Sequence, residues 1–274
     1  MAVKKSTDNA LSMIKIGKGM SAVRALPKAK GKRPAIILLH ERYGIDQHTK
    51  DLTAKLAQAG FVGLAPDLFS RFAGDRKALQ KGQARVEIRD DEAIEDLNAA
   101  IDYLKKVDSV DGSHIALIGV CQTGRQPLLL AAHRDDLAAV VVLYGAIGAK
   151  EWDGNELRPA PIEKLVARVS CPILGIFGEA DHIISLDDVV RFRNCLEWAK
   201  KSYHVRLYQG APHGWLNNTM PGRYRKEAAK DAWSLMMIFL KQSFSNGQDV
   251  NRITWKFEGD YSADYDFKKN VRME

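Results

Sequence analysis

The chain has 274 residues, of which 46% are hydrophobic and 27% are charged, a composition that indicates an ordinary soluble globular protein and excludes a disordered or fibrous one. Lys and Arg exceed Asp and Glu by 41 to 34, a net charge of +7, but the basic residues are scattered, so we expect small anionic molecules rather than nucleic acid as partners. No apolar run approaches the roughly 18 residues of a membrane span, no signal peptide is visible, and the three cysteines lack paired spacing, which favours a cytoplasmic protein without a metal site.

From residue 33 onward, apolar runs alternate with amphipathic segments. RPAIILLH (33–40) is a continuous apolar run, as in buried parallel strands, and in 91–107 apolar side chains recur every three or four residues, as on one helix face. In chain order the pattern predicts a strand at 33–40, a helix at 48–60, a strand at 61–69, a helix at 91–107, a strand at 114–120, a helix at 125–134, strands at 137–145 and 171–178, a helix at 186–201, a strand at 203–210 and a helix at 224–244. This alternation predicts an α/β fold with a mostly parallel sheet and helices on both faces.

Two segments lie outside this alternation. Residues 11–26 could supply one or two antiparallel strands at the sheet edge, and the aromatic-rich stretch 253–268 either wraps the core or docks on another subunit as a homo-oligomer contact. We therefore divide the chain into an N-terminal arm (1–32), an α/β core (33–244) and a C-terminal arm (245–274). Within the core, 149–165 is either a lid or a crossover.

Chemically reactive side chains follow four of the predicted strands, and ligands of such sheets bind beyond the carboxyl ends of the strands. These residues are Glu41, Arg42 and Tyr43 after 33–40, Cys121 after 114–120, Asp181 after 171–178 and His213 after 203–210. Nucleophile, acid and histidine thus occur in the chain order of the α/β-hydrolase fold.

This set suits nucleophilic catalysis by a thiol. A free thiol has a pKa of about 8.5 and is mostly protonated at neutral pH, so Cys121 needs a base such as His213. Asp181 would then orient the imidazole. The helix after Cys121 favours the thiolate, and the backbone N–H groups of Gln122 and Arg42 are the expected oxyanion donors.

Five stretches of the chain resemble the dienelactone hydrolase family of α/β-hydrolases, over roughly residues 33–243. They are LLHERYGI (38–45), GFVGLAPDLF (60–69), IGVCQTG (118–124), FGEADHIIS (177–185) and APHGW (211–215). The resemblance implies Cys121 as nucleophile, Asp181 as acid, His213 as base, and a Glu41 that contacts the resting cysteine and moves when substrate binds. It also implies hydrolysis of an enol-lactone or related ester through a thioester acyl-enzyme, without metal or organic cofactor.

The chain departs from the family pattern at three positions. Thr123 replaces a glycine of the nucleophile turn, Pro127 lies early in the following helix, and Asn217 or a neighbour lies where the family has a carboxylate-binding arginine. Because Thr123 adds a branched side chain, we expect the turn that carries Cys121 to open slightly. Candidates for a substitute carboxylate ligand are Arg125, Arg42 and Arg85, and Tyr43 and Trp215 either line the pocket or pack in the core.

Plainer interpretations stand beside these. Thr123 could mark a collapsed turn in an inactive or ligand-binding member of the fold, or Cys121 could serve thiol redox chemistry, although no resolving cysteine is near it in sequence. Cys171 and Cys195 are expected to be buried. The remaining alternatives are Asp181 as a cap near Ile183, Glu41 in a surface ion pair with Arg42, His182 in place of His213, and His40 as a backbone-bonded residue.

Overall fold

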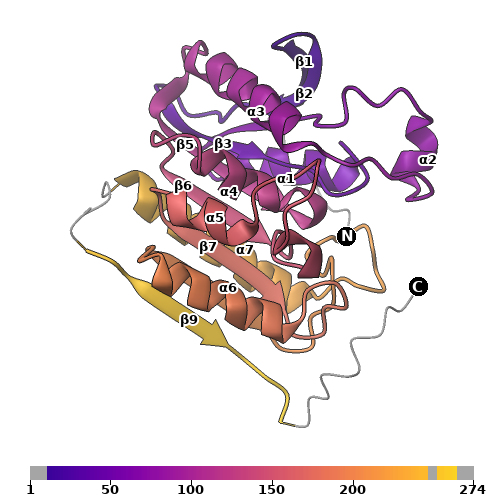
Figure 1. The fold of residues 1–274 in the computed structure, drawn as a ribbon. Coiled ribbons are helices and arrows are strands. Elements are labelled where there is room, and N and C mark those ends of the chain that lie inside the picture. Colours follow the sequence, from indigo (N-terminus) through magenta and orange to yellow (C-terminus); the bar gives the residue numbers. More distant parts are fainter. Residues whose placement is uncertain (1–10, 246–251, 264–274) are drawn as a thin grey trace, which may run out of the picture.

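A computed structural model describes residues 11–245 and 252–263 of the chain, and its strands form one sheet (Figure 1). The strands are β1 (Leu11–Ile16), β2 (Met20–Ala25), β3 (Arg33–Leu38), β4 (Val62–Pro66), β5 (Val110–Val120), β6 (Ala139–Leu143), β7 (Ile173–Gly178), β8 (Tyr203–Tyr208) and β9 (Trp255–Gly259). Their order across the sheet is β1-β2-β4-β3-β5-β6-β7-β8-β9. All pairings from β4 to β9 are parallel, while β1 and β2 join antiparallel at one edge.

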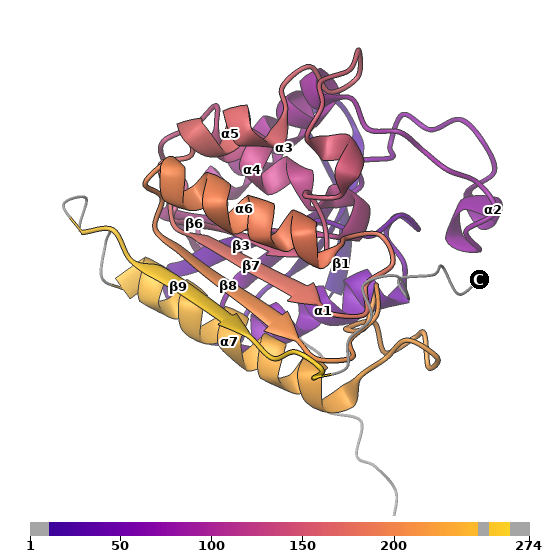
Figure 2. The same ribbon diagram turned by 60° about the horizontal axis from the view of Figure 1, so that its bottom comes forward.

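Helices cover both faces of this sheet. They are α1 (Gln47–Gln58), α2 (Arg76–Gln80), α3 (Asp90–Lys105), α4 (Arg125–Ala131), α5 (Ile162–Arg168), α6 (Leu186–Trp198) and α7 (Lys226–Ser245), with short 3₁₀ turns η1 (Cys121–Thr123) and η2 (Ala149–Glu151). In Figure 2, α3, α4, α5 and α6 lie on one side of the sheet and α1 and α7 on the other. One apolar cluster packs under the first group of helices and a second packs under α1 and α7. The fold is the α/β-hydrolase fold expected from the sequence.

The predicted edge strands and alternating core are confirmed, with differences at their ends. β5 begins at Val110 rather than residue 114, because Val110 pairs with Arg33 of β3. The short helices α2 and α5 were not predicted, since five and seven residues give too little periodicity to detect. α5 connects β6 to β7, so the end of 149–165 is part of a crossover.

The C-terminal arm adds a strand to the sheet. β9 pairs parallel with β8, so this part of the arm lies along the core, while residues 264–268 of the aromatic stretch are outside the described residues. Ser262 Oγ donates to Glu179 Oε2 (2.9 Å), which ties the end of the arm to the loop after β7. None of the described helices is long and apolar enough to cross a membrane.

Candidate active site

Cys121 occupies a tight turn between β5 and α4. Its φ of 54° lies in the left-handed region, which is unfavourable for a residue with a Cβ and typical of a strained nucleophile turn. A Cβ at Gly119 would lie 2.4 Å from the Thr123 carbonyl oxygen and 2.7 Å from Pro127 Cδ. Glycine at 119 therefore lets the first turn of α4 pack against the end of β5.

Three loops bring the predicted nucleophile, base and acid into contact. His213 Nε2 lies 3.0 Å from Cys121 Sγ, and His213 Nδ1 lies 2.8 Å from Asp181 Oδ2. The other oxygen of Asp181 accepts hydrogen bonds from the backbone N–H groups of Ile183 (2.8 Å) and Ile184 (3.1 Å). Asp181 therefore caps this segment, as the plainer interpretation expected, and also contacts the imidazole.

The electrostatics of this cluster favour a charged imidazole. Burial opposes the charged form of His213, but the negative charges of Cys121 and Asp181 and their hydrogen bonds outweigh it, so the pKa of His213 is raised well above its usual value. Cys121 itself is partly exposed, whereas Asp181 is fully buried. The arrangement combines a reachable sulfur with a base held in a buried pair.

Thr123 strengthens the turn rather than collapsing it. Its buried hydroxyl donates to the His40 carbonyl (2.9 Å) and accepts from the Val120 N–H (3.1 Å), which connects the turn to the loop after β3. Pro127 is the third residue of α4, where the missing N–H has no helical partner to lose. Neither departure from the family pattern separates Cys121 from His213.

Glu41 is buried and lies in a polar cluster behind the turn. Its Oε1 accepts from the Tyr144 hydroxyl (3.1 Å) and its Oε2 accepts from Asn217 Nδ2 (2.7 Å). Burial raises the pKa of Glu41, with opposing contributions from His48 and Asn217. Glu41 therefore forms no surface ion pair with Arg42. Its two oxygens bond Tyr144 and Asn217 and not Cys121, whose Sγ contacts His213 instead.

Tyr144 is a site residue that sequence reasoning missed. Its ring packs edge-on against the His213 ring, with centroids 5.4 Å apart, and burial together with the charges of Glu41 and Cys121 raises its pKa well above the usual value. The sequence predicts a strand at 137–145, which placed Tyr144 inside it. The observed β6 ends at Leu143 and Tyr144 directly follows it, so the strand-end rule finds this residue only once the true end of the strand is known.

The side chains of the two expected oxyanion donors hold one neighbouring segment. Arg42 Nη2 donates to the Gly82 carbonyl (2.9 Å), and Gln122 Nε2 donates to the Val86 carbonyl (2.5 Å). Residues 82–86 thus connect the loop after β3 to the nucleophile turn. They lie between the predicted strand at 61–69 and the predicted helix at 91–107, where the sequence predicted no element.

Two sequence-predicted site residues are placed elsewhere. The Arg125 guanidinium is buried and bonded to Asp90 (2.7 and 2.9 Å) and Glu151 (3.1 Å), so it is not available to a substrate carboxylate. Trp215 is fully buried and packs against Tyr144 and Tyr208, so it supports the site without lining it. Their positions follow from partners that are remote in sequence.

A different arginine lies beside the base. A Cβ at Gly214 would lie 3.8 Å from Arg223 Cδ, and within the described part of the chain the Arg223 guanidinium has no ion pair. Burial and Glu41 raise the pKa of the partly exposed Tyr43, whereas the positive charges of Arg42 and Arg223 oppose that rise. Arg85, in contrast, pairs with Glu87 at 2.7 Å.

His40 has a structural position, and Cys171 and Cys195 are buried as expected. His40 Nδ1 lies 2.7 Å from the Glu41 carbonyl and its Nε2 accepts from the Leu68 N–H (3.1 Å), as expected for a backbone-bonded residue. The His182 ring lies 5.9 Å from the His213 ring. Burial raises the pKa of Cys171 to about 12 and that of Cys195 to about 11.

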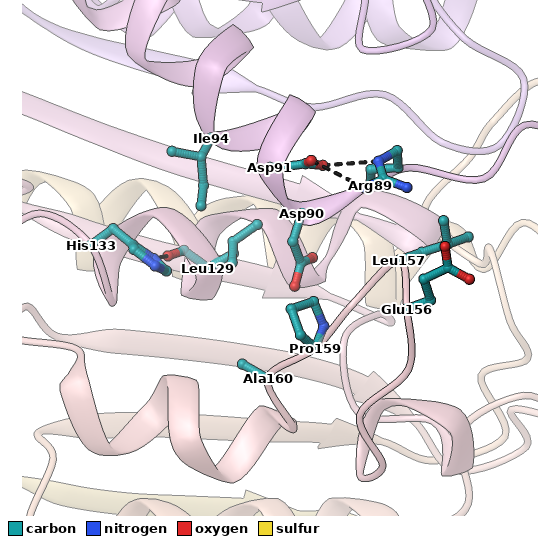
Figure 3. A pocket seen from close by; sticks show the side chains of 10 residues that line it. All are labelled: Arg89, Asp90, Asp91, Ile94, Leu129, His133, Glu156, Leu157, Pro159 and Ala160. Atoms are coloured by element: carbon teal, nitrogen blue, oxygen red, sulfur yellow. Dashed lines mark hydrogen bonds and ion pairs between the residues drawn. The ribbon is translucent and has the colours of Figure 1, made fainter.

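A separate cavity of about 250 Å³ lies between the start of α3, the side of α4 and residues 156–160 (Figure 3). Asp90, which points into it, is held by Arg125, and Asp91 is paired with Arg89. Neither Cys121 nor His213 lines this cavity, so it is distinct from the candidate active site.

Comparisons with known proteins agree with this fold. The model of the dienelactone hydrolase family matches residues 20–244. A Methylorubrum extorquens protein named "Putative carboxymethylenebutenolidase" is 30% identical over 226 residues, which cover 81% of this chain and 76% of that protein. A Bradyrhizobium protein named "Probable 2-oxo-3-(5-oxofuran-2-ylidene)propanoate lactonase" is 31% identical over 82% of this chain and 90% of its own length. A crystal structure titled "Putative Dienelactone Hydrolase", from Klebsiella pneumoniae, superposes with a TM-score of 0.77 and 28% identity, covering 85% of this chain and 98% of that one.

Proposed function

The chain belongs to the dienelactone hydrolase family and is a hydrolase of the α/β-hydrolase fold, and we propose that it cleaves small anionic esters or lactones with Cys121 as nucleophile. The observation that carries the proposal is the unbroken contact from Cys121 Sγ to His213 Nε2 (3.0 Å) and from His213 Nδ1 to Asp181 Oδ2 (2.8 Å). These are the contacts that a nucleophile, a base and an orienting acid require.

The first half of the reaction forms a thioester. His213 holds the proton of Cys121, and the sulfur attacks the carbonyl carbon to give a tetrahedral oxyanion. The backbone N–H groups of Gln122 and Arg42 stabilise this oxyanion. When the carbon–oxygen bond breaks, His213 returns the proton to the leaving oxygen, and the acyl group remains on sulfur.

The second half releases the acid. His213 accepts a proton from water while the water oxygen attacks the thioester carbonyl, and collapse of the second tetrahedral species breaks the carbon–sulfur bond. The products are a carboxylic acid and the original thiol–imidazole pair, so the cycle needs no metal or organic cofactor. A lactone opens to one hydroxy acid, or to its keto form when the leaving oxygen is an enolate.

Glu41 is proposed to modulate the nucleophile. Its carboxylate is buried beside Tyr144, which packs on His213, so a change in its charge acts on the base through one intervening ring. The family resemblance implies a Glu41 that contacts the resting cysteine, but here Glu41 bonds Tyr144 and Asn217 while Cys121 Sγ already contacts His213. The proposed effect of Glu41 is therefore on the charge of the base and not on release of the thiolate.

Positive charge near the site supports an anionic substrate. The positive charges of Arg42 and Arg223 both act to lower the pKa of Tyr43. Arg223 lies against Gly214 and has no ion pair among the described residues. The name of the Bradyrhizobium relative denotes a substrate that carries both a lactone and a carboxylate. We therefore assign substrate carboxylate binding to Arg223, with Tyr43 lining the approach.

A redox function for Cys121 has less support. Cys171 precedes β7 and Cys121 follows β5, so in this parallel sheet the two thiols lie at opposite ends of the strands. Cys171 therefore cannot act as a resolving thiol without a large rearrangement. All three cysteines are free, which suits the reducing, cytoplasmic compartment that the sequence favours.

Hydrolysis of an aryl acetate, with detection of the acyl-enzyme by mass spectrometry, tests the proposal. Cys121→Ala and His213→Ala are expected to abolish turnover, and the acetyl group trapped by rapid acid quenching is expected on the peptide that contains Cys121. Cys195→Ala is the matched control and should keep the activity, since Cys195 is buried in α6. Full activity of Cys121→Ala would reject the assignment.

A further inference from the structure

β9 presents a free strand edge at one end of the sheet. Among the described residues, no strand pairs with the side of β9 that faces away from β8. Tyr203 N donates to the Thr254 carbonyl (2.8 Å) and Asp260 N donates to the Leu207 carbonyl (3.3 Å), so the even-numbered residues direct their backbone groups to β8. The N–H and C=O groups of Trp255, Phe257 and Gly259 therefore point outward, and such an edge is a template for another strand.

We propose that β9 pairs antiparallel with β9 of a second copy of this chain, about a two-fold axis that passes through Phe257. In this register the outward-pointing residues form the hydrogen-bonded pairs, with Phe257 opposite Phe257 and Trp255 opposite Gly259. A C2 interface of this kind requires a surface that is complementary to itself. The sequence WKFEG meets that condition in both backbone pattern and charge.

The charges of β9 select this register. Lys256 and Glu258 lie on the same face and contact each other within one copy at 3.1 Å. Across the two-fold axis, Lys256 of each copy lies directly opposite Glu258 of the other, in the non-hydrogen-bonded pairs where side chains approach most closely. A shift of one residue along the strand would remove both of these opposite-charge pairs.

The strand at the other end of the sheet lacks this complementarity. β1 is also an edge strand, and its Met13 is 62% exposed. Its sequence LSMIKI contains one charged residue, Lys15, and no acid that could face it from a second copy. The charge pattern therefore favours pairing through β9 over pairing through β1.

Exposed aromatic side chains lie at the same end of the molecule. Trp255 is 51% exposed, and its register partner in β8 is Tyr203. Tyr203 contacts Glu197 of α6 (2.6 Å), and the next residue, Trp198, is 83% exposed. Figure 1 draws α6 next to β9, and the Arg193 guanidinium of α6 lies 5.2 Å from the centre of the Phe257 ring of β9. Exposed tryptophans next to an open strand edge are typical of a protein interface.

Sedimentation velocity over a range of concentrations tests the pairing. The wild-type chain is expected to reach twice the chain mass, with the amides of Trp255 and Phe257 protected from hydrogen exchange in the dimer. Glu258→Lys places Lys opposite Lys and should raise the dimer dissociation constant by about tenfold or more. The exchanged pair Lys256→Glu with Glu258→Lys restores opposite charges and should recover dimerisation.

Two further variants separate the interface from the fold. Trp255→Pro removes an outward N–H without removing a bond to β8, so it should weaken the dimer while the chain stays folded. Lys15→Glu in β1 should leave the dimer unchanged. Aryl ester hydrolysis by each variant reports on the distant Cys121 site separately, so the two proposals can fail independently.

Three results would overturn the proposal. The first is a wild-type chain that stays monomeric up to the highest concentration studied. The second is a dimer that neither Glu258→Lys nor Trp255→Pro weakens. The third is protection of the Trp255 and Phe257 amides in the monomer, which would show that another part of the same chain covers the edge.

Discussion

Asp181→Asn is expected to leave the fold intact and to change which ring nitrogen of His213 carries the proton. Asp181 Oδ1 accepts from two backbone N–H groups, those of Ile183 and Ile184, whereas Oδ2 contacts His213 Nδ1 at 2.8 Å. Asparagine has one acceptor oxygen, and two N–H donors hold it at the Oδ1 position, so its NH2 group turns towards His213. The imidazole must then accept at Nδ1 and carry its proton on Nε2, the nitrogen that faces Cys121.

A proton on Nε2 prevents His213 from accepting the thiol proton, while the remaining contacts persist. We expect kcat/KM for p-nitrophenyl acetate to fall by about 10³- to 10⁴-fold, which corresponds to roughly 4–5.5 kcal/mol of transition-state stabilisation. Circular dichroism should show an unchanged fold, and Asp187→Asn, at an exposed position in the first turn of α6, should keep wild-type activity. If Asp181→Asn retains more than about a tenth of the activity, the argument from hydrogen-bond polarity is wrong.

Three other predictions follow from buried groups. Burial raises the pKa of Cys171 to about 12 and that of Cys195 to about 11, so at neutral pH only about 10⁻⁵ and 10⁻⁴ of these thiols are ionised. Iodoacetamide should therefore label Cys121 first, and equal labelling rates of the three cysteines would refute the activated thiol. Thr123→Val leaves the bonded carbonyl and N–H unsatisfied and should lower the free energy of unfolding by about 1–3 kcal/mol in urea, whereas Thr123→Ser should cost less; equal effects would contradict the role of the hydroxyl. Burial raises the pKa of Glu41 in the folded state, so the wild type loses stability as the pH rises from the unfolded-state pKa to the folded-state pKa. Glu41→Gln should therefore melt at a higher temperature than the wild type at pH 8 but not at pH 4. The same variant should change the pH dependence of Cys121 alkylation, and an identical profile argues against modulation by Glu41.

The sequence alone determined the alternation of strands and helices and the strand ends at which Cys121, Asp181 and His213 lie. These features follow from local periodicity and from the rule that parallel strands present their carboxyl ends at one edge of the sheet. The chain order of the three residues then identified a nucleophile, an acid and a base before any distance between them was known.

The tertiary structure alone decided the partners of the buried polar groups. Arg125 is 35 residues from Asp90 in sequence and Glu41 is 176 residues from Asn217, so no local pattern indicates that these side chains bond to each other. Thr123 could equally have opened the turn, and only its contact with the His40 carbonyl shows that it closes it. Side chains buried together must satisfy one another because water is absent there, and which of them meet depends on how distant segments pack.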